Sequence, residues 1–541
     1  MEKKKNDFIA QGSILAIASI LVRVMGMIYR IPMTAIIGDK GNGFYSYAYS
    51  VYTILLLLSS YSLPLAVSKM VSAKAQLGQW RNVKRVFICA IAFAIGIGTT
   101  FGLIVLIGAQ LFTRVFFHSE LAAIALRFMA PTILIMALLG VFRGFFQGLQ
   151  NTLPTAVSQI VEGLINAIMS VVFAYFLFDF GHGMDAAGGT TDLGYAWGAA
   201  GGAIGTGAGA LAGLIFCFIL FVAYRKILAV NISRDKTGTQ QEYGDIFRLM
   251  LSIALPVILS TALYNLIELV DGSLFNNIMA SKGMEDVKDS MWGAYNAKAL
   301  LLVHIPVSIS SAMAVSLVPT LTAAYALGDE QTAKSKVHAI LRFISILAFP
   351  SAVGLLVLAN PIIKTLFSGD TSAASTYLQV VCPAVITFSF STITNSILQG
   401  IDRMNLPVCH SLIAMAVHVV VLLILCLGFN MGIYGVIISY VIYALVITIL
   451  NFYSISKILE YRPDVVKPAV ASGIMGIVCF GCYQLLYQFL GKAIPMLISV
   501  VVAVIVYFAV AVKCKLLTES VMRDLPKGSM LIRIAKKCRL M

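Results

Sequence analysis

The sequence is short of charged residues. Only 12% of its 541 residues are Asp, Glu, Lys or Arg, whereas 59% are hydrophobic and the mean hydropathy is +0.91. Soluble globular domains carry about 25% charged residues, so this composition excludes an ordinary soluble protein. Apolar runs recur along the whole chain, and a helix of roughly 20 apolar residues crosses the hydrocarbon core of a bilayer. The composition therefore predicts an all-α polytopic membrane protein.

The chain also lacks the short motifs of common catalytic sites. Neither a phosphate-binding GxxxxGK[ST] loop nor an HExxH helix occurs in it. Its nine cysteines lie mostly inside apolar runs, and its one CxxC, formed by Cys479 and Cys482, has no histidine nearby. The sequence thus predicts a protein that is not an enzyme and needs no cofactor. Any transport would then draw on a sodium or proton gradient, on the membrane potential, or on exchange.

Polar breaks divide the apolar runs into about fourteen predicted spans. They lie near residues 9–37, 44–68, 86–112, 121–146, 155–178, 196–224, 246–279, 292–318, 337–366, 373–398, 407–428, 433–456, 467–489 and 494–512.

The loops between these spans differ in charge. The set that includes both termini holds 27 Lys and Arg, and the opposite set holds five: Lys40, Arg114, Lys282, Lys288 and Lys492. Because cytoplasmic loops are enriched in Lys and Arg, both termini are predicted to be cytoplasmic. The net charge of +15 is spread over this one membrane face. The expected partners of that face are therefore anionic membrane lipids, and not nucleic acid.

A weak internal repeat divides the chain into two halves. Residues 127–159 resemble residues 377–411, and residues 66–78 resemble residues 314–328, at offsets near 250. Six spans separate the copies, so both copies enter the membrane from the same side, which is a parallel repeat. We predict an N-terminal six-helix lobe (1–225), a cytoplasmic linker (226–245), a C-terminal six-helix lobe (246–457), an additional helix pair (467–512) and a basic cytoplasmic tail (513–541).

A few ionisable residues lie inside the predicted spans, where each costs roughly 3 kcal/mol unless it faces protein or water. Arg23 and Arg30 are seven residues apart and share one helix face. Glu268 and Asp271, three residues apart, share a face of the span that the repeat pairs with theirs. Two interpretations follow: a structural salt bridge between the halves, or arginines that bind an anionic substrate with acids that re-pair with them or bind a coupling cation.

Further charged residues complete the predicted site. Lys69 follows the second span and Arg143 lies toward the cytoplasmic end of the fourth; both are candidate substrate-binding cations. Glu162 in the fifth span is a candidate coupling acid. Lys298 and His304 in the eighth span are additional candidates. For each of these residues a packing role, or that of an ordinary loop lysine, remains an alternative.

Two stretches near the start carry a family resemblance. "LVRVMGMIYRIPMTAIIG" and "GFYSYAYSVYTILLLLSSYSLPLAVSKMVSAKAQLG" resemble the opening of the polysaccharide-transport branch of the multidrug/oligosaccharidyl-lipid/polysaccharide exporter superfamily. The resemblance is nearest to the lipid II flippases and the stage V sporulation protein B group. It implies two lobes arranged in a V around a cationic cavity. The implied function is transfer of an undecaprenyl-diphosphate-linked cell-wall precursor, lipid II foremost, from the inner to the outer leaflet.

The resemblance also implies site residues and partners. Arg23, Gly26 and Arg30 occupy the places of an arginine, glycine, arginine pattern in the first helix of the flippases. The additional helix pair would form a groove for the lipid tail, and Asp402 falls near a position that binds sodium in some members. Cell-wall synthesis enzymes are implied partners, and the plasma membrane of a Gram-positive bacterium is the implied location. The alternative is a cation-coupled multidrug exporter of the same superfamily, which the acids Glu162, Glu268 and Asp271 would suit.

Overall fold

The computed structural model describes residues 18–537, except 61, 189–191, 239, 327, 370, 460–464, 492, 520–521 and 523–527. All regular structure in this part of the chain is helical, and no strand occurs in it. The predicted fold class, an all-α membrane protein, is confirmed. Packing contacts group the chain into two units, Met1–Ala294 and Tyr295–Met541.

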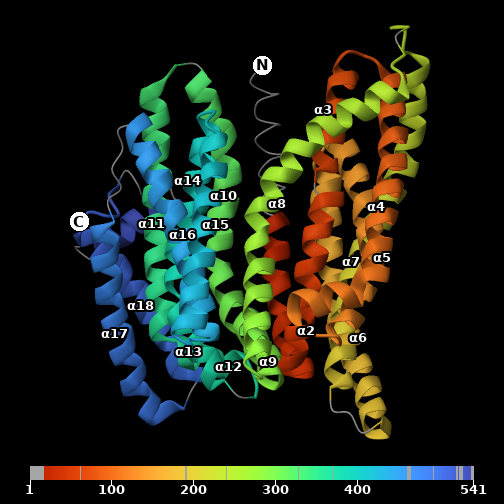
Figure 1. Cartoon of the computed structure of the whole chain (residues 1–541). Helices are drawn as coiled ribbons and strands as arrows, with labels where there is room; N and C mark the ends of the chain where they lie inside the picture. The colour runs from red at the N-terminus through yellow and green to blue at the C-terminus, as the bar shows by residue number, and fades with distance from the viewer. Residues whose placement is uncertain are drawn as a thin grey trace. The chain divides into compact units, whose positions relative to one another are not determined.

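Unit 1 is a bundle of long helices (Figure 1). A short helix, Ala18–Ile28, precedes them. The helices that follow are α2 (Arg30–Ser59), α3 (Leu63–Gln76), α4 (Trp80–Phe117), α5 (Ala122–Gly148), α6 (Leu153–Gly188), α7 (Leu193–Ser233), α8 (Tyr243–Ser281) and α9 (Glu285–Ala294).

Unit 2 contains the remaining helices, two of which carry π-helical segments. They are η1 (Tyr295–Leu300), α10 (Leu301–Ala326), α11 (Glu330–Val357), α12 (Ala359–Leu366), α13 (Ser372–Val381), α14 (Pro383–Gly400), α15 (Asn405–Leu423), η2 (Ile424–Gly428), α16 (Ile433–Leu459), α17 (Val466–Leu490), α18 (Ala493–Lys513) and α20 (Gly528–Lys537). By their contacts, α8 and α9 belong to unit 1, where α8 packs on α4 and α9 packs on α2. The predicted lobe boundaries at 225 and 246 stay a prediction.

Eleven helices of the described residues are long and apolar enough to cross a membrane, or twelve if the bent pair α13 and α14 forms one span. Most predicted spans coincide with one of these helices. Span 9–37 begins outside the described residues, and span 246–279 corresponds to α8. Span 337–366 was predicted too long, because α11 ends at Val357 and α12 is a separate short helix.

The first two predicted spans meet at a kink inside α2. Gly38 has φ 62° and ψ −173°, a backbone conformation that favours glycine. The Asn42 side chain donates a hydrogen bond to the Gly38 carbonyl at 2.7 Å and so satisfies an acceptor that the kink leaves open. The polar break "GDKG" predicted this interruption, but the chain makes it with a single non-helical residue.

Small residues let α6 and α7 pack at close range. Gly201 and Gly205 of α7 face the α6 backbone near Ala174 and Ser170, and a Cβ atom at either glycine would overlap that backbone. Such contacts between small residues are typical of packed membrane helices. The α6–α7 hairpin is therefore a closely packed support for the side chains that α6 points toward α5. In Figure 1 the joined ends of the two helices project beyond their neighbours in unit 1.

Because successive spans run in opposite directions, alternate loops of unit 1 lie at opposite ends of its helix bundle. At one end, Lys40 Nζ lies 2.8 Å from Asp192 Oδ2. At the other end, Asp235 accepts hydrogen bonds from the amides of Arg81 and Thr237, each at 2.9 Å, and from the Thr237 hydroxyl at 2.6 Å. These hydrogen bonds lower the pKa of Asp235 to about 2. The linker between α7 and α8 is thus anchored to the start of α4.

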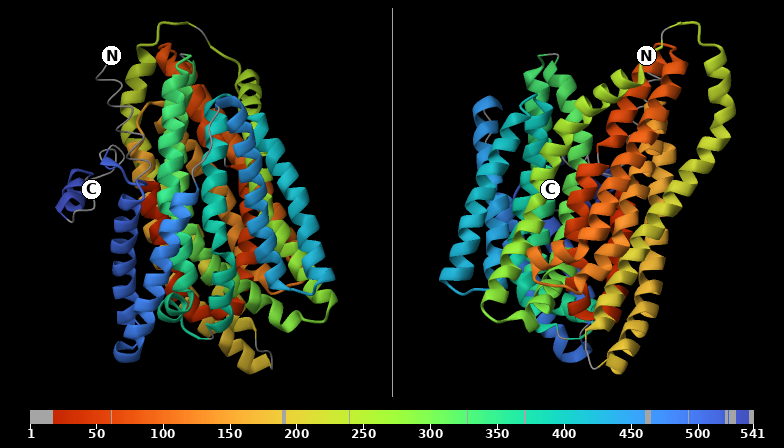
Figure 2. Two further views of the ribbon diagram at one scale, coloured as in Figure 1. Left: turned by 90° about the vertical axis from the view of Figure 1, so that its left-hand side faces the viewer. Right: turned by 45° about the vertical axis from the view of Figure 1, so that its right-hand side comes forward.

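In unit 2, α14 packs against α10, α11 and α16, and α15 packs against α16. The helices α17 and α18 pair with each other, and α17 lies along α11 (Figure 2). The Arg342 guanidinium donates to the carbonyls of Lys515 and Leu516, both at 2.9 Å, which fixes the chain just after α18 to α11. This end is further packed by apolar residues of α17, α18 and α20.

Candidate functional site

Arg30 begins α2 at the edge of a row of tyrosines on that helix. Tyr45, Tyr49 and Tyr52, here called the tyrosine row, are spaced i, i+4, i+7 and share one helix face. Their ring centroids are 5.8 Å apart between the first two and 5.9 Å between the last two. The half-buried Arg30 guanidinium lies 6.0 Å from the centroid of the Tyr45 ring, within the range of a cation–π contact. The kink at Gly38 separates Arg30 from the tyrosine row along the helix.

The predicted acids Glu268 and Asp271 lie on α8, which packs against α2 inside unit 1. Arg30 interacts electrostatically with Glu268, and Glu268 interacts with Asp271 and with the Ser50 hydroxyl. Asp271 is only 3% exposed. Among the described residues, however, Arg30 forms no ion pair within 4.0 Å. Arg30 therefore interacts with Glu268 through electrostatics and not through a direct ion pair.

Arg143 and Glu162, one predicted cation and one predicted acid, form a direct ion pair. Arg143 Nη2 lies 2.6 Å from Glu162 Oε2, and Arg143 Nε donates to Ser158 Oγ at 2.9 Å. Ser158 gives its own proton to the Thr155 carbonyl, so its oxygen is free to accept from the arginine. Arg143 is 9% exposed. This geometry favours a neutralised structural pair over a free substrate-binding cation.

The Arg143–Glu162 ion pair lies next to the end of the tyrosine row in unit 1. Tyr52 interacts electrostatically with Glu162, and the Tyr45 hydroxyl lies 3.4 Å from Thr206 Oγ1 on α7. Polar groups therefore follow one another from Arg30, along the tyrosine row, to the Arg143–Glu162 pair. We call this series the polar track. It crosses a bundle that is mainly apolar, and buried polar groups of this kind are costly unless they pair with one another or face a polar ligand or water.

The other predicted site residues are not members of the polar track. Arg23, on the helix Ala18–Ile28, and Lys69, on α3, are exposed. Lys298 in η1 is 2% exposed, and His304 on α10 is exposed. Both belong to unit 2.

Asp402 also belongs to unit 2 and occupies the turn after α14. It is exposed, with φ 60°. No group of three or more His, Cys, Asp or Glu side chains gathers there or elsewhere among the described residues. A sodium ion at Asp402 stays a prediction.

Sequence reasoning missed two sets of functional candidates. The first is the tyrosine row, whose i, i+4, i+7 spacing was a readable signal. The second is a buried cluster on α9: Lys288, counted as a loop residue, is only 1% exposed. Its Nζ lies 2.8 Å from Asp289 Oδ1 and 3.2 Å from the Phe117 carbonyl. No local pattern predicted that a lysine in "EDVKDSMW" would be buried.

Neighbouring side chains extend this cluster to α2 and α8. The Lys288 ammonium lies 5.8 Å from the centroid of the Tyr47 ring. The Tyr47 hydroxyl donates to Asn276 Oδ1 at 2.7 Å, and Trp292 Nε1 donates to Ser46 Oγ at 3.2 Å. The α9 cluster thus binds three helices together at the end of unit 1 that holds the kink in α2.

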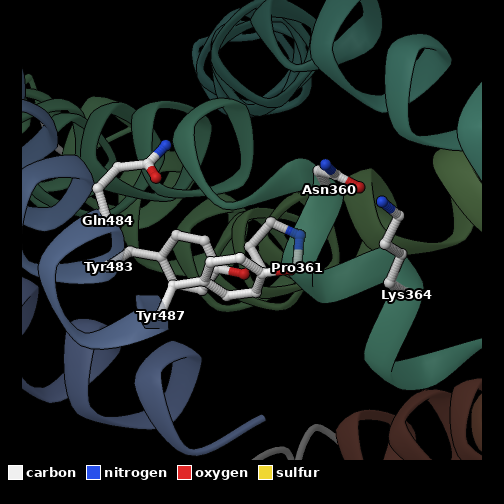
Figure 3. A pocket seen from close by; sticks show the side chains of 6 residues that line it. All are labelled: Asn360, Pro361, Lys364, Tyr483, Gln484 and Tyr487. Atoms are coloured by element: carbon white, nitrogen blue, oxygen red, sulfur yellow. The ribbon is translucent and has the colours of Figure 1, made fainter. Parts of the chain in front are cut away.

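A small pocket lies at one end of α12 and α17 in unit 2. Its volume is about 160 Å³, and Figure 3 shows its six lining residues: Asn360, Pro361, Lys364, Tyr483, Gln484 and Tyr487. The two tyrosine rings are 5.6 Å apart. Three of the six residues come from α17, in the additional helix pair that was predicted to hold a lipid tail. The pocket is lined by polar and aromatic groups, and the groove itself stays a prediction.

The long apolar helices define the chain as a multi-pass membrane protein. Comparison with known families agrees. The family model described as Polysaccharide biosynthesis protein matches residues 8–324, and the model described as MatE matches residues 256–424. The first match covers more than half of the sequence. This chain therefore belongs to the polysaccharide biosynthesis protein family, within the multidrug/oligosaccharidyl-lipid/polysaccharide exporter superfamily.

Individual relatives support the same family membership. The chain is 26% identical over 422 residues to the lipid II flippase MurJ of Bacillus subtilis (strain 168). The matched region covers 75% of this chain and 75% of that protein. It is 22% identical over 539 residues to stage V sporulation protein B of the same organism, covering 98% of this chain and 100% of that protein. A solved structure of a lipid II flippase MurJ in an inward closed conformation shares the fold. Its TM-score is 0.63 at 16% identity, over 92% of this chain and 97% of that chain.

Proposed function

We propose that this protein is a flippase that moves an undecaprenyl-diphosphate-linked cell-wall precursor from the inner to the outer leaflet by alternating access. Lipid II is the substrate that we favour. The observation that carries the proposal is Arg30, a half-buried cation with no ion pair among the described residues. Its planar guanidinium can donate two parallel hydrogen bonds to a phosphate. The likeness to a lipid II flippase over 75% of both chains supports it.

The physical task matches the polar track. A sugar diphosphate cannot cross hydrocarbon alone, because its polar groups would lose their hydrogen bonds to water. Arginine and tyrosine hydroxyls offer replacement donors while the lipid tail stays in the bilayer. With the cell interior negative, outward movement of an anion is favoured by about 2.3 kcal/mol per charge per 100 mV. The potential can therefore drive the step, alone or beside a sodium or proton gradient.

The proposal includes a location and partners. We place the protein in the plasma membrane of a Gram-positive bacterium with both termini in the cytoplasm. The excess of 27 over five basic residues in alternate loops and the likeness to Bacillus subtilis proteins support this. A flippase for such a precursor would serve peptidoglycan synthesis and cell shape. Its partners would be anionic lipids and the wall-synthesis enzymes that make and consume the precursor.

A second candidate function is a cation-coupled multidrug exporter. The MatE model matches residues 256–424, which include Glu268 and Asp271, and buried acids suit a cationic drug. Glu268 would then bind the drug or the coupling ion, and Arg30 would act only as its counter-charge.

Reconstitution separates the two functions. The purified chain is placed in proteoliposomes with fluorescent lipid II, and the labelled head group that reaches the opposite leaflet is measured with and without a membrane potential. In parallel, cells with and without the protein are loaded with cationic dyes. The flippase proposal predicts lipid II transfer and no dye efflux. Dye efflux without lipid II transfer would establish the exporter instead.

A further inference from the structure

A polar network is buried between α14, α15 and α16 of unit 2, and none of its residues has a role in the proposed function. His410 of α15 is 8% exposed, and Asn451 of α16 and Thr394 of α14 are fully buried. His410 Nδ1 lies 2.7 Å from Asn451 Oδ1. The Asn451 amide also contacts Thr394 Oγ1 at 3.0 Å and Asn395 Oδ1 at 2.7 Å. His410 is the one residue in this network with an ionisable side chain.

The neighbours of Asn451 determine which way its amide points. Thr394 gives its hydroxyl proton to the Phe390 carbonyl at 2.7 Å, so its oxygen accepts from Asn451. Asn395 Oδ1 can only accept. Both protons of Asn451 Nδ2 are therefore used, and the amide atom that faces His410 is the oxygen.

This orientation assigns the tautomer of His410. An amide oxygen can only accept, so Nδ1 carries the proton that makes the 2.7 Å hydrogen bond. Neutral imidazole has one N–H group, which leaves the lone pair on Nε2. Nε2 lies 3.4 Å from Ser454 Oγ, and the Ser454 side chain is half-buried. The basic nitrogen of His410 therefore faces the more accessible side of the network.

We propose that His410 Nε2 is a proton-binding site that is loaded and emptied during transport. A proton added at Nε2 gives an imidazolium with two neutral acceptors in place, Asn451 Oδ1 and Ser454 Oγ. No covalent bond other than the N–H bond changes. The transport part of this inference rests on the proposed function, whereas the proton site itself does not.

Few other titratable groups face His410. Helix α14 contains none, and η2 contains only Cys426. On α15 they are the exposed Cys409 and the buried His418, and α16 adds four tyrosines and Lys457, whose exposed ammonium lies 5.0 Å from the Tyr453 ring centroid. Asp402 and Arg403, in the turn before α15, are exposed. No charged side chain is among the hydrogen-bond partners of His410 in the described part of the chain.

The first test detects the proton directly and needs no transport. The full chain is purified in detergent with ring-nitrogen-labelled histidine, and the six histidines are followed by NMR from pH 8 to pH 5. The His410 signal is the one absent from His410→Asn. It should show a protonated Nδ1 and a bare Nε2 at high pH, then titrate. His338→Asn, on the exposed face of α11, is the matched control and should remove a different signal. A His410 signal that stays unchanged over this range, or that carries its proton on Nε2, would overturn the site.

The second test measures flipping against pH in proteoliposomes held at zero potential. The wild-type rate should depend on pH with a measurable midpoint, and His410→Asn should lose that dependence. Asn451→Asp places a carboxylate beside Nδ1, which favours the imidazolium, so the midpoint should rise by about one pH unit or more. A structural role for His410 would not produce this shift. An active wild type with a flat profile overturns the proposal, whereas an inactive wild type refutes the proposed function and leaves the NMR result standing.

Discussion

Replacing Glu162 by Gln should destabilise unit 1, because it leaves the Arg143 guanidinium buried without its acid. Arg143 is 9% exposed and its Nη2 lies 2.6 Å from Glu162 Oε2. Removing one partner of a buried pair costs about 3–5 kcal/mol. Because 25% of the Glu162 side chain is exposed, water partly replaces it, and the expected loss is about 3 kcal/mol. Ser158 still accepts from Nε but supplies no charge.

The assay is heat-induced unfolding of the purified chain in detergent. Glu162→Gln and Arg143→Met should each lower the midpoint, and the double variant should recover most of the loss because it buries no charge. Arg114→Ala is the matched control: Arg114 and Glu120 pair at 3.7 Å with most of their side chains exposed, so the expected change is about 0–1 kcal/mol. Losses that simply add in the double variant would refute the pairing. Flipping by a stable double variant would show that Arg143 is not a substrate-binding residue.

Two further predictions concern the ends of unit 1. The pKa of Asp235 is lowered to about 2 by hydrogen bonds to two backbone amides and the Thr237 hydroxyl, so its contribution to stability is present above about pH 4 and disappears as the pH falls toward 2. Hydrogen exchange of the linker amides, corrected for intrinsic rates, should rise over that window in the wild type and be high throughout in Asp235→Asn; a flat wild-type response would contradict the anchoring role. Lys288→Met should lower the unfolding midpoint, because it leaves Asp289 buried without its cation, whereas Lys84→Met, at an exposed position of α4, should not. Equal midpoints for the two lysine variants would show that the α9 cluster contributes nothing to stability.

The sequence predicted the helices better than their contacts. Hydropathy placed α5, α16 and α17 within a few residues, because each is a long apolar run between polar breaks. It extended the ninth span to 366, because the apolar "ANPIIKTL" continues the run after Val357 although the chain forms a separate helix there. Composition reports the hydrophobicity of a segment. It does not report where the helix changes direction within that segment.

In the candidate site, too, the sequence predicted helix positions but not the contacts between helices. Helical spacing predicted that Glu268 and Asp271 would lie together, and they do interact. The pairing of Arg143 with Glu162 depends on how α5 and α6 are rotated against each other, which no local pattern reports. Lys288 was treated as a loop residue because charged residues surround it in sequence, yet the ring of Tyr47 and the carbonyl of Phe117, both far away along the chain, enclose it.

We propose that Arg30 binds the diphosphate of the substrate. Lipid II flipping by Arg30 variants, measured in proteoliposomes with equal protein incorporation, tests this role directly. Losing hydrogen bonds to a charged group costs about 1.5–3 kcal/mol, so Arg30→Ala should slow flipping roughly 10- to 150-fold. Arg30→Lys should fall between Arg30→Ala and wild type, because lysine keeps the charge but loses the planar fork. Arg114→Ala, which changes an exposed arginine, should flip at the wild-type rate. Wild-type flipping by Arg30→Ala would show that Arg30 does not bind the diphosphate.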